Sequence, residues 1–166
     1  PNTCLAAAPC SLADATNPGY TSPGDEVILA PGTYTPGVAI GIAEPVDVHG
    51  TGAPDLTHIV SDQVLGVAIS HPDATLRNVT VDHSVGNNGA LLGVSGTVSN
   101  SKFVSSGAVS CAMRNIVIRD SFCINTGVSG TAAWINDGGA GTYSSVLRNV
   151  TAVSTGSGSI GLMVLA

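Results

Sequence analysis

One ten-residue pattern occurs three times in this chain and limits its fold more than any other feature. Each copy contains an apolar residue, an arginine, an asparagine, a β-branched residue, any residue and then another apolar residue. The copies are TLRNVTVDHS (75–84), AMRNIVIRDS (112–121) and VLRNVTAVST (146–155), and TVSNSKFVSS (97–106) is a weaker fourth. Repeats on this scale are typical of solenoids, in which each unit buries its apolar face only against its neighbours. The pattern therefore predicts a chain wound into stacked coils.

The segments between these copies are short apolar runs separated by Gly, Asn, Asp and Ser. They include GVAIS, ALLGVS, TAAWIN and IGLMVLA. Runs that are apolar at nearly every position are typical of parallel strands. We therefore expect two or more strands in each coil of about 20 to 25 residues, continuous over residues 24–166.

The first expected coil opens with GDEVILAPGTYT (24–35). Its four apolar residues Val27 to Ala30 are bounded by turn signals, which predicts a strand buried on both faces, with Ile28 in the core. Residues 1–23 differ from the rest of the chain. In CSLADATNP, Ser11 is a plausible N-cap and Asn17-Pro18-Gly19 a stop, so we expect a cap with one short helix.

These segments resemble a known family. GDEVILAPGTYT is similar to the first coil, and the LRNVTV units are similar to later coils, of right-handed parallel β-helix proteins of the pectate-lyase-like superfamily. The resemblance implies an all-β fold, a right-handed parallel β-helix (solenoid) with a short N-terminal capping helix. Many proteins of this kind bind or cleave polysaccharide, although a solenoid hosts many functions.

The repeated asparagines are expected to occupy one turn of the coil. Aligning the copies places Asn78, Asn100, Asn115 and Asn149 in one column. Asparagine tolerates left-handed backbone geometry, and stacked amides can satisfy a buried polar column. The apolar residues that alternate around them are expected to point inward as core.

The residue before each asparagine is expected to point outward. In the three clear copies it is Arg77, Arg114 or Arg148. Such a strip could bind an acidic glycan through bidentate arginine–carboxylate hydrogen bonds. The alternative is that these charges serve solubility and prevent aggregation of a flat β surface.

Asp82-His83 is the most suggestive catalytic pair. Pectate lyases carry a strand motif that ends in Asp-His, and the alignment puts Asp82 with Arg119, and His83 with Asp120, in shared outward columns. Lyase chemistry of that family would require Ca²⁺. The chain lacks the Trp-Ile that precedes Asp-His in those enzymes and any later Arg-Pro-x-x-Arg segment, so the alternative is an exposed pair at a strand end. No complete catalytic site is recognised, and whether the protein is an enzyme stays open.

Trp134 is the one candidate for an aromatic platform on which a sugar could stack. It lies in AAWINDGG beside Asp137. A single tryptophan in an apolar run is also a common core residue, which is the alternative.

The four cysteines form two close pairs, Cys4 with Cys10 and Cys111 with Cys123. Because they lack the spacing of a metal site, we expect two disulfides and therefore an extracellular or cell-surface location. Buried thiols are the alternative. No metal site and no cofactor are evident from the sequence.

Composition limits the partners. Five Lys and Arg residues are too few for a nucleic-acid surface, and no apolar run approaches the length of a membrane span. The last segment, IGLMVLA, is apolar throughout, so we expect further coils of a longer parent protein or a partner subunit to cover it.

Two functions remain open: a β-helix that binds or processes extracellular polysaccharide, and a structural or adhesive stalk. A carboxylate cluster on an outward face would favour the first function, and smooth Ser/Thr/Gly faces would favour the second.

Overall fold

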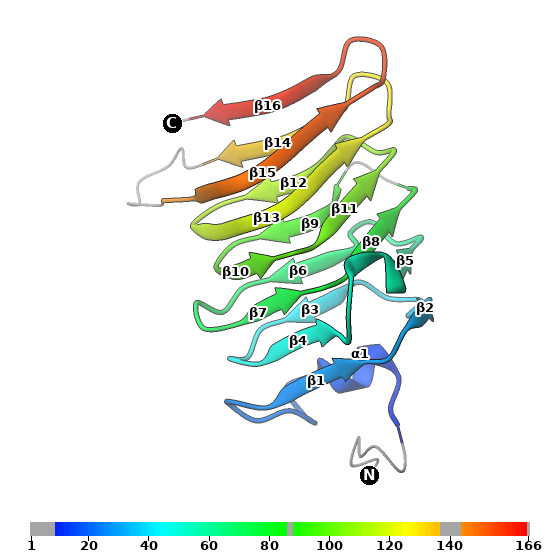
Figure 1. Cartoon of the computed structure of the whole chain (residues 1–166), viewed down its shortest axis with the longest axis vertical. Helices are drawn as coiled ribbons and strands as arrows, with labels where there is room; N and C mark the ends of the chain where they lie inside the picture. Colours follow the sequence, from blue (N-terminus) through cyan, green and yellow to red (C-terminus); the bar gives the residue numbers. More distant parts are fainter. Residues whose placement is uncertain (1–8, 86–87, 137–143, 166) are drawn as a thin grey trace.

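Short parallel strands wind into stacked coils in the computed structural model of the protein (Figure 1). The structure describes residues 9–85, 88–136 and 144–165. Its strands form a ten-stranded and a six-stranded sheet, and the strand pairs in both are parallel. The protein is an all-β parallel β-helix, as the repeat predicts.

Each coil has three faces, because the ten-stranded sheet folds over a corner. Strands β13 (Ile116–Asn125) and β15 (Val146–Ser154) are long enough to run across this corner and belong to two faces. The first face consists of β1 (Glu26–Leu29), β4 (Asp47–Gly50), β7 (Thr75–Arg77), β10 (Gly96–Ser99) and the first halves of β13 and β15. The second face consists of β2 (Gly32–Tyr34), β5 (Thr57–Ser61), β8 (Thr80–His83), β11 (Lys102–Ser105) and the second halves of β13 and β15.

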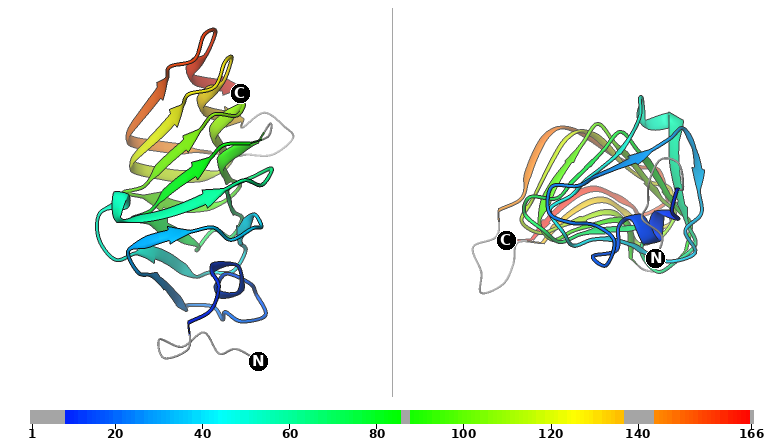
Figure 2. Two further views of the ribbon diagram at one scale, coloured as in Figure 1. Left: turned by 90° about the vertical axis from the view of Figure 1, so that its right-hand side faces the viewer. Right: turned by 90° about the horizontal axis from the view of Figure 1, so that it is seen from below.

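The six-stranded sheet is the third face and contributes one strand to each coil. It consists of β3 (Ile40–Ile42), β6 (Val67–Ile69), β9 (Gly89–Gly93), β12 (Val109–Met113), β14 (Thr131–Asn136) and β16 (Ile160–Leu165). Viewed along the stack, the three faces enclose one interior (Figure 2).

A short helix, α1 (Leu12–Ala15), lies at the N-terminal end of the stack, where the sequence predicts a cap (Figure 2). The Ser11 hydroxyl accepts a hydrogen bond from the backbone N–H of Asp14 at 3.1 Å and so caps the helix. Leu12 is buried against the first coil. A 3₁₀ turn, η1 (Pro54–Leu56), precedes β5. No helix in the described part of the chain has the length and apolar character needed to cross a membrane.

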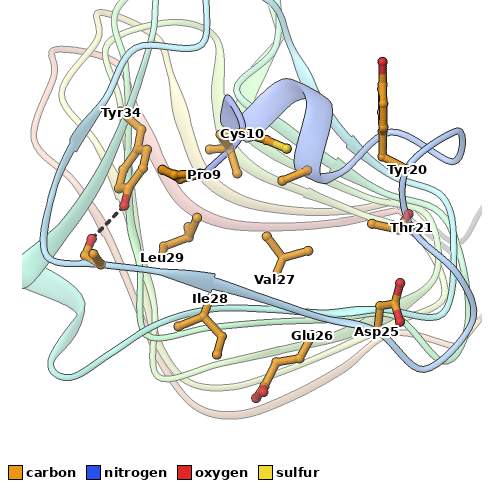
Figure 3. Close-up of a pocket in the computed structure, with 13 residues that line it drawn as sticks. Pro9, Cys10, Tyr20, Thr21, Asp25, Glu26, Val27, Ile28, Leu29 and Tyr34 are labelled. Atoms are coloured by element: carbon orange, nitrogen blue, oxygen red, sulfur yellow. Dashed lines mark hydrogen bonds between the residues drawn. The ribbon is translucent and has the colours of Figure 1, made fainter. Parts of the chain in front are cut away.

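The first strand is buried on one face only, so the prediction for Ile28 is wrong. Val27 and Leu29 point toward the interior, whereas Ile28 points outward and is 58% exposed (Figure 3). Ile28 is the register partner of His49, on the outer side of the first face, which no other layer covers. Side chains alternate along the strand, and only every second one reaches the core.

The interior is filled by inward side chains that stack from coil to coil. Phe103, Ile116 and Ile118 are fully buried there, as expected. A disulfide joins Cys111 of β12 to Cys123 of β13 inside this core, which confirms the second predicted pair. Cys10 is also disulfide-bonded, and Cys4 lies outside the described residues.

The asparagine column has one member that the alignment assigned wrongly. Asn78, Asn100 and Asn149 have positive φ and share a corner, but the fourth residue there is Asp120. Asn115 also has positive φ, but it precedes β13 at a different corner. The side-chain amide of Asn100 donates to the Asn78 Oδ1 at 2.8 Å, and that of Asn149 donates to Asp120 at 2.9 Å.

Candidate functional site

The outer side of the first face carries two columns of side chains, one residue from each coil. The first column contains Glu26, Asp47, Thr75, Thr97, Val117 and Val146. The second contains Ile28, His49, Arg77, Ser99, Arg119 and Arg148. Titratable groups lie at the N-terminal end of both columns and at the C-terminal end of the second, whereas the first column ends in valines.

The N-terminal end of this surface holds what we name the charged cluster: Glu26, Asp47, His49, Thr75 and Arg77. Its best-bonded member is Asp47. The Arg77 Nη2 donates to the Asp47 Oδ2 at 2.6 Å, and the Arg77 Nε lies 3.1 Å from the same oxygen. The Thr75 hydroxyl also donates to Asp47.

Glu26 and His49 complete the charged cluster. The His49 Nε2 lies 2.7 Å from the Glu26 Oε1, and the Arg77 Nη2 lies 3.5 Å from the same oxygen. The other ring nitrogen of His49, Nδ1, lies 3.2 Å from the backbone oxygen of Gly50. Arg77 thus contacts both carboxylates of the cluster.

The contacts within the charged cluster shift two pKa values. Burial raises the pKa of Asp47, but hydrogen bonds from Arg77 and Thr75 and the positive charges of Arg77 and His49 outweigh it and hold this pKa below the ordinary value. The hydrogen bond to Asp47 raises the pKa of Arg77. The pair is therefore ionised at neutral pH.

The C-terminal end of the surface holds what we name the arginine pair, Arg119 and Arg148. The two residues are register partners on β13 and β15, and both are exposed. Arg119 approaches Asp120 at 3.8 Å, and within the described residues Arg148 has no ion pair. The expected arginine column therefore exists with a different membership, because Arg119 takes the place predicted for Arg114.

Arg114 and Trp134 lie on the third face, away from the arginine pair. Arg114 directly follows β12, and its Nε donates to the backbone oxygen of Asn136 at 3.3 Å. Trp134 is paired with Ala112 and is partly exposed, and its buried indole N–H has no hydrogen-bond partner among the residues that the structure describes. Asp137 lies outside the described residues. The structure thus separates the predicted ligand-binding residues onto two faces.

The predicted pair Asp82-His83 does not form one site, because the two side chains point to opposite sides of β8. His83 is 3% exposed, and its Nε2 donates to the Gln63 backbone oxygen at 2.8 Å. Asp82 is paired with Val104 and His83 with Ser105. The predicted columns with Arg119 and Asp120 are therefore wrong, since both of those residues precede the second half of β13.

Asp82 has a different partner that the sequence did not suggest. The His58 Nδ1 donates to the Asp82 Oδ2 at 2.8 Å, and the His58 Nε2 donates to the Asp55 backbone oxygen at 3.1 Å. The hydrogen bond to Asp82 raises the pKa of His58 above its ordinary value. Because both ring nitrogens donate hydrogen bonds, His58 links η1 to the neighbouring strand of the second face. Neither nitrogen is then free to accept a proton from a substrate.

The sequence interpretation missed Glu26, Asp47 and His49 as site residues. Glu26, Asp47 and His49 each offer one ligand atom, and these atoms all lie within 4.8 Å of one another. Of the residues described, these are the ones that could hold a metal ion. The available signal was the alternation of polar and apolar residues in EVIL and DVHG, which places Glu26, Asp47 and His49 on the outer side.

Comparison of the chain with protein-family models found no match. Comparisons with curated proteins and with solved structures found none either.

Proposed function

We propose that the protein binds an acidic extracellular polysaccharide on the outer side of the first face. Two features support the proposal: the charged side chains gathered on this surface, and the sequence resemblance to the pectate-lyase-like superfamily. Glu26 and Asp47 also put two carboxylates on the outer side of this face, which favours a glycan-binding or glycan-processing role over a structural one.

The arginine pair is the observation that carries this proposal. Arg119 and Arg148 are exposed and in register on neighbouring strands, about 4.8 Å apart along the stack. A guanidinium can bind a carboxylate or sulfate through two parallel hydrogen bonds. Two such groups on one flat surface suit a ligand that repeats an anionic group.

The column also gives the ligand a direction. Arg77, Ser99, Arg119 and Arg148 follow one another from coil to coil. A polymer that lies parallel to the stack would meet a polar side chain at each strand, and the Thr75 and Thr97 side chains flank its path. Binding in this direction uses several coils, whereas binding across the stack would use one.

The test is affinity for polygalacturonate and for a neutral polysaccharide, measured by isothermal titration at low and high salt. We expect binding of the acidic polymer only, weakened by salt because exposed charges are screened. The double substitution Arg119→Gln and Arg148→Gln should lower the affinity by about tenfold or more. Arg114→Gln, on the third face, is the matched control and should leave the affinity unchanged.

A structural or adhesive role is the alternative, and the second face favours it. Phe122 is 49% exposed on its outer side, and Val153 of the adjacent strand β15 is also exposed. If neither polysaccharide binds, or if Arg114→Gln weakens binding as much as the double substitution does, the polysaccharide proposal fails and this apolar surface becomes the better candidate.

A further inference from the structure

We propose that Glu26, Asp47 and His49 of the charged cluster form a binding site for a divalent transition-metal ion of the Zn²⁺ class. The three side chains come from two adjacent strands, β1 and β4, whose register is fixed by Glu26 pairing with Asp47. Their ligand atoms all lie within 4.8 Å of one another. Small movements of the side chains would bring all three within bonding distance of one ion.

The environment of His49 is the feature that points to a cation. Its Nδ1 and Nε2 both face oxygen atoms, from the Gly50 backbone and from Glu26. The 2.7 Å separation of Nε2 and the Glu26 Oε1 is that of a hydrogen bond. A metal ion that binds both atoms would replace this hydrogen bond and would require the exposed Glu26 carboxylate to move outward. A backbone carbonyl that fixes the second nitrogen is one of the usual partners of a metal-binding histidine.

The ligand types select the kind of ion. One imidazole nitrogen and two carboxylates suit Zn²⁺ and its neighbours in the transition series, which accept nitrogen and oxygen together. Ca²⁺ and Mg²⁺ prefer oxygen ligands alone. The site should therefore discriminate against Ca²⁺ and Mg²⁺.

Arg77 is the competitor for this site. Its Nη2 lies 2.6 Å from the Asp47 Oδ2 and 3.5 Å from the Glu26 Oε1, so its charge balances the carboxylates when no metal is bound. A metal ion at these oxygens would have to displace the guanidinium. Removing the guanidinium should therefore strengthen metal binding, whereas removing any of the three ligands should weaken it.

The experiment is isothermal titration of the full chain with ZnCl₂, repeated with CaCl₂ and accompanied by thermal melting. We expect one Zn²⁺ per chain, a higher melting temperature with Zn²⁺, and no binding of Ca²⁺. His49→Gln and Glu26→Gln should each lower the Zn²⁺ affinity by at least about tenfold. Arg77→Gln should raise it.

His58→Gln is the matched control, because it removes another histidine that is hydrogen-bonded to a carboxylate, and it should leave Zn²⁺ affinity unchanged. The exposed Glu26 carries the test if His49→Gln proves unstable. The proposal is overturned if neither the native chain nor Arg77→Gln binds Zn²⁺. It is also overturned if Glu26→Gln binds Zn²⁺ as tightly as the native chain, or if His58→Gln weakens binding as strongly as the ligand substitutions do.

Discussion

The two ends of the outer first face have the same backbone arrangement but use their charges differently. At the N-terminal end, Arg77 contacts the carboxylates of Asp47 and Glu26. At the C-terminal end, Arg148 occupies the same column and, among the residues described, forms no ion pair. An arginine at one position of the coil can therefore stabilise the fold or remain available to a ligand.

The neighbouring column explains this difference. Glu26 and Asp47 stand beside the N-terminal part of the arginine column, whereas Val117 and Val146 stand beside the C-terminal part. Valine offers no acceptor, so the guanidinium groups of the arginine pair extend into solvent without a carboxylate from that column. An acid at the neighbouring outward position thus holds the arginine in an ion pair, whereas a valine there leaves the guanidinium exposed to solvent.

The largest difference between the two ends is expected in stability. Asp47→Ala removes the acceptor of Arg77 and Thr75 from a partly buried site and should lower the free energy of unfolding by about 2 kcal/mol. Arg148→Ala should change it by less than about 0.5 kcal/mol. Urea unfolding of both variants measures the two free energies of unfolding. Equal losses would show that Arg148 stabilises the fold as much as the Arg77–Asp47 contact does.

Acid should remove the contribution of the charged cluster. The folded-state pKa of Asp47 lies below its ordinary value of 3.8, so its stabilisation is present above that value and is lost as the pH falls through the lower folded pKa. Melting temperatures of the native chain and of Asp47→Ala should therefore converge in this acidic range. Curves that stay parallel down to the lowest accessible pH would contradict the assignment.

Asp120 gives a smaller test at the C-terminal end. Its carboxylate accepts from Asn149 but has no N–H to donate to Asn100, so it interrupts the amide column. Asp120→Asn keeps a residue that tolerates positive φ and supplies the missing donor. We expect a gain of about 0.5 to 1 kcal/mol in urea unfolding.

The same substitution should also sharpen the ligand-binding comparison. Asp120→Asn removes the negative charge 3.8 Å from Arg119 and should raise the affinity for the acidic polymer. If urea unfolding instead shows that Asp120→Asn is less stable than the native chain, the carboxylate of Asp120 makes a more favourable contact than an amide would make in this column.

The smallest effect is expected from the His58–Asp82 pair on the second face, and its pH dependence has the opposite sign. The folded-state pKa of His58 lies above its ordinary value of 6.5, so its stabilisation is complete below pH 6.5 and is lost as the pH rises through the higher folded pKa. Melting temperatures of the native chain should fall slightly in that range. In Asp82→Asn this slope should be weaker, and an unchanged slope would assign it to another group.

The sequence predicted the architecture because coil, strand and turn signals agree over most of the chain. It misplaced the register where one motif occurs at two corners. The Arg-Asn pair of 114–115 resembles those of 77–78 and 148–149, but it follows β12 of the third face, whereas the other two pairs lie at the corner between the first and second faces. When Asp120 is assigned to the column instead of Asn115, the intervals between successive column members change from 15 and 34 residues to 20 and 29.

The charged cluster could not be predicted for a related reason. Glu26 and Asp47 lie 21 residues apart in segments that share no motif with the arginine copies. Their proximity depends on the register of β1 with β4, which local patterns do not determine. His83 shows the converse, since a family-like motif was present but strand alternation placed its two residues on opposite sides.

The most direct test of the proposed division of the first face is a crystal structure of the protein with a bound galacturonate oligosaccharide. The account predicts an extended ligand parallel to the stack, with carboxylates on the guanidinium groups of Arg119 and Arg148 and with the Arg77–Asp47 contact intact. A ligand bound at Trp134 on the third face, with the arginine pair untouched, would contradict it.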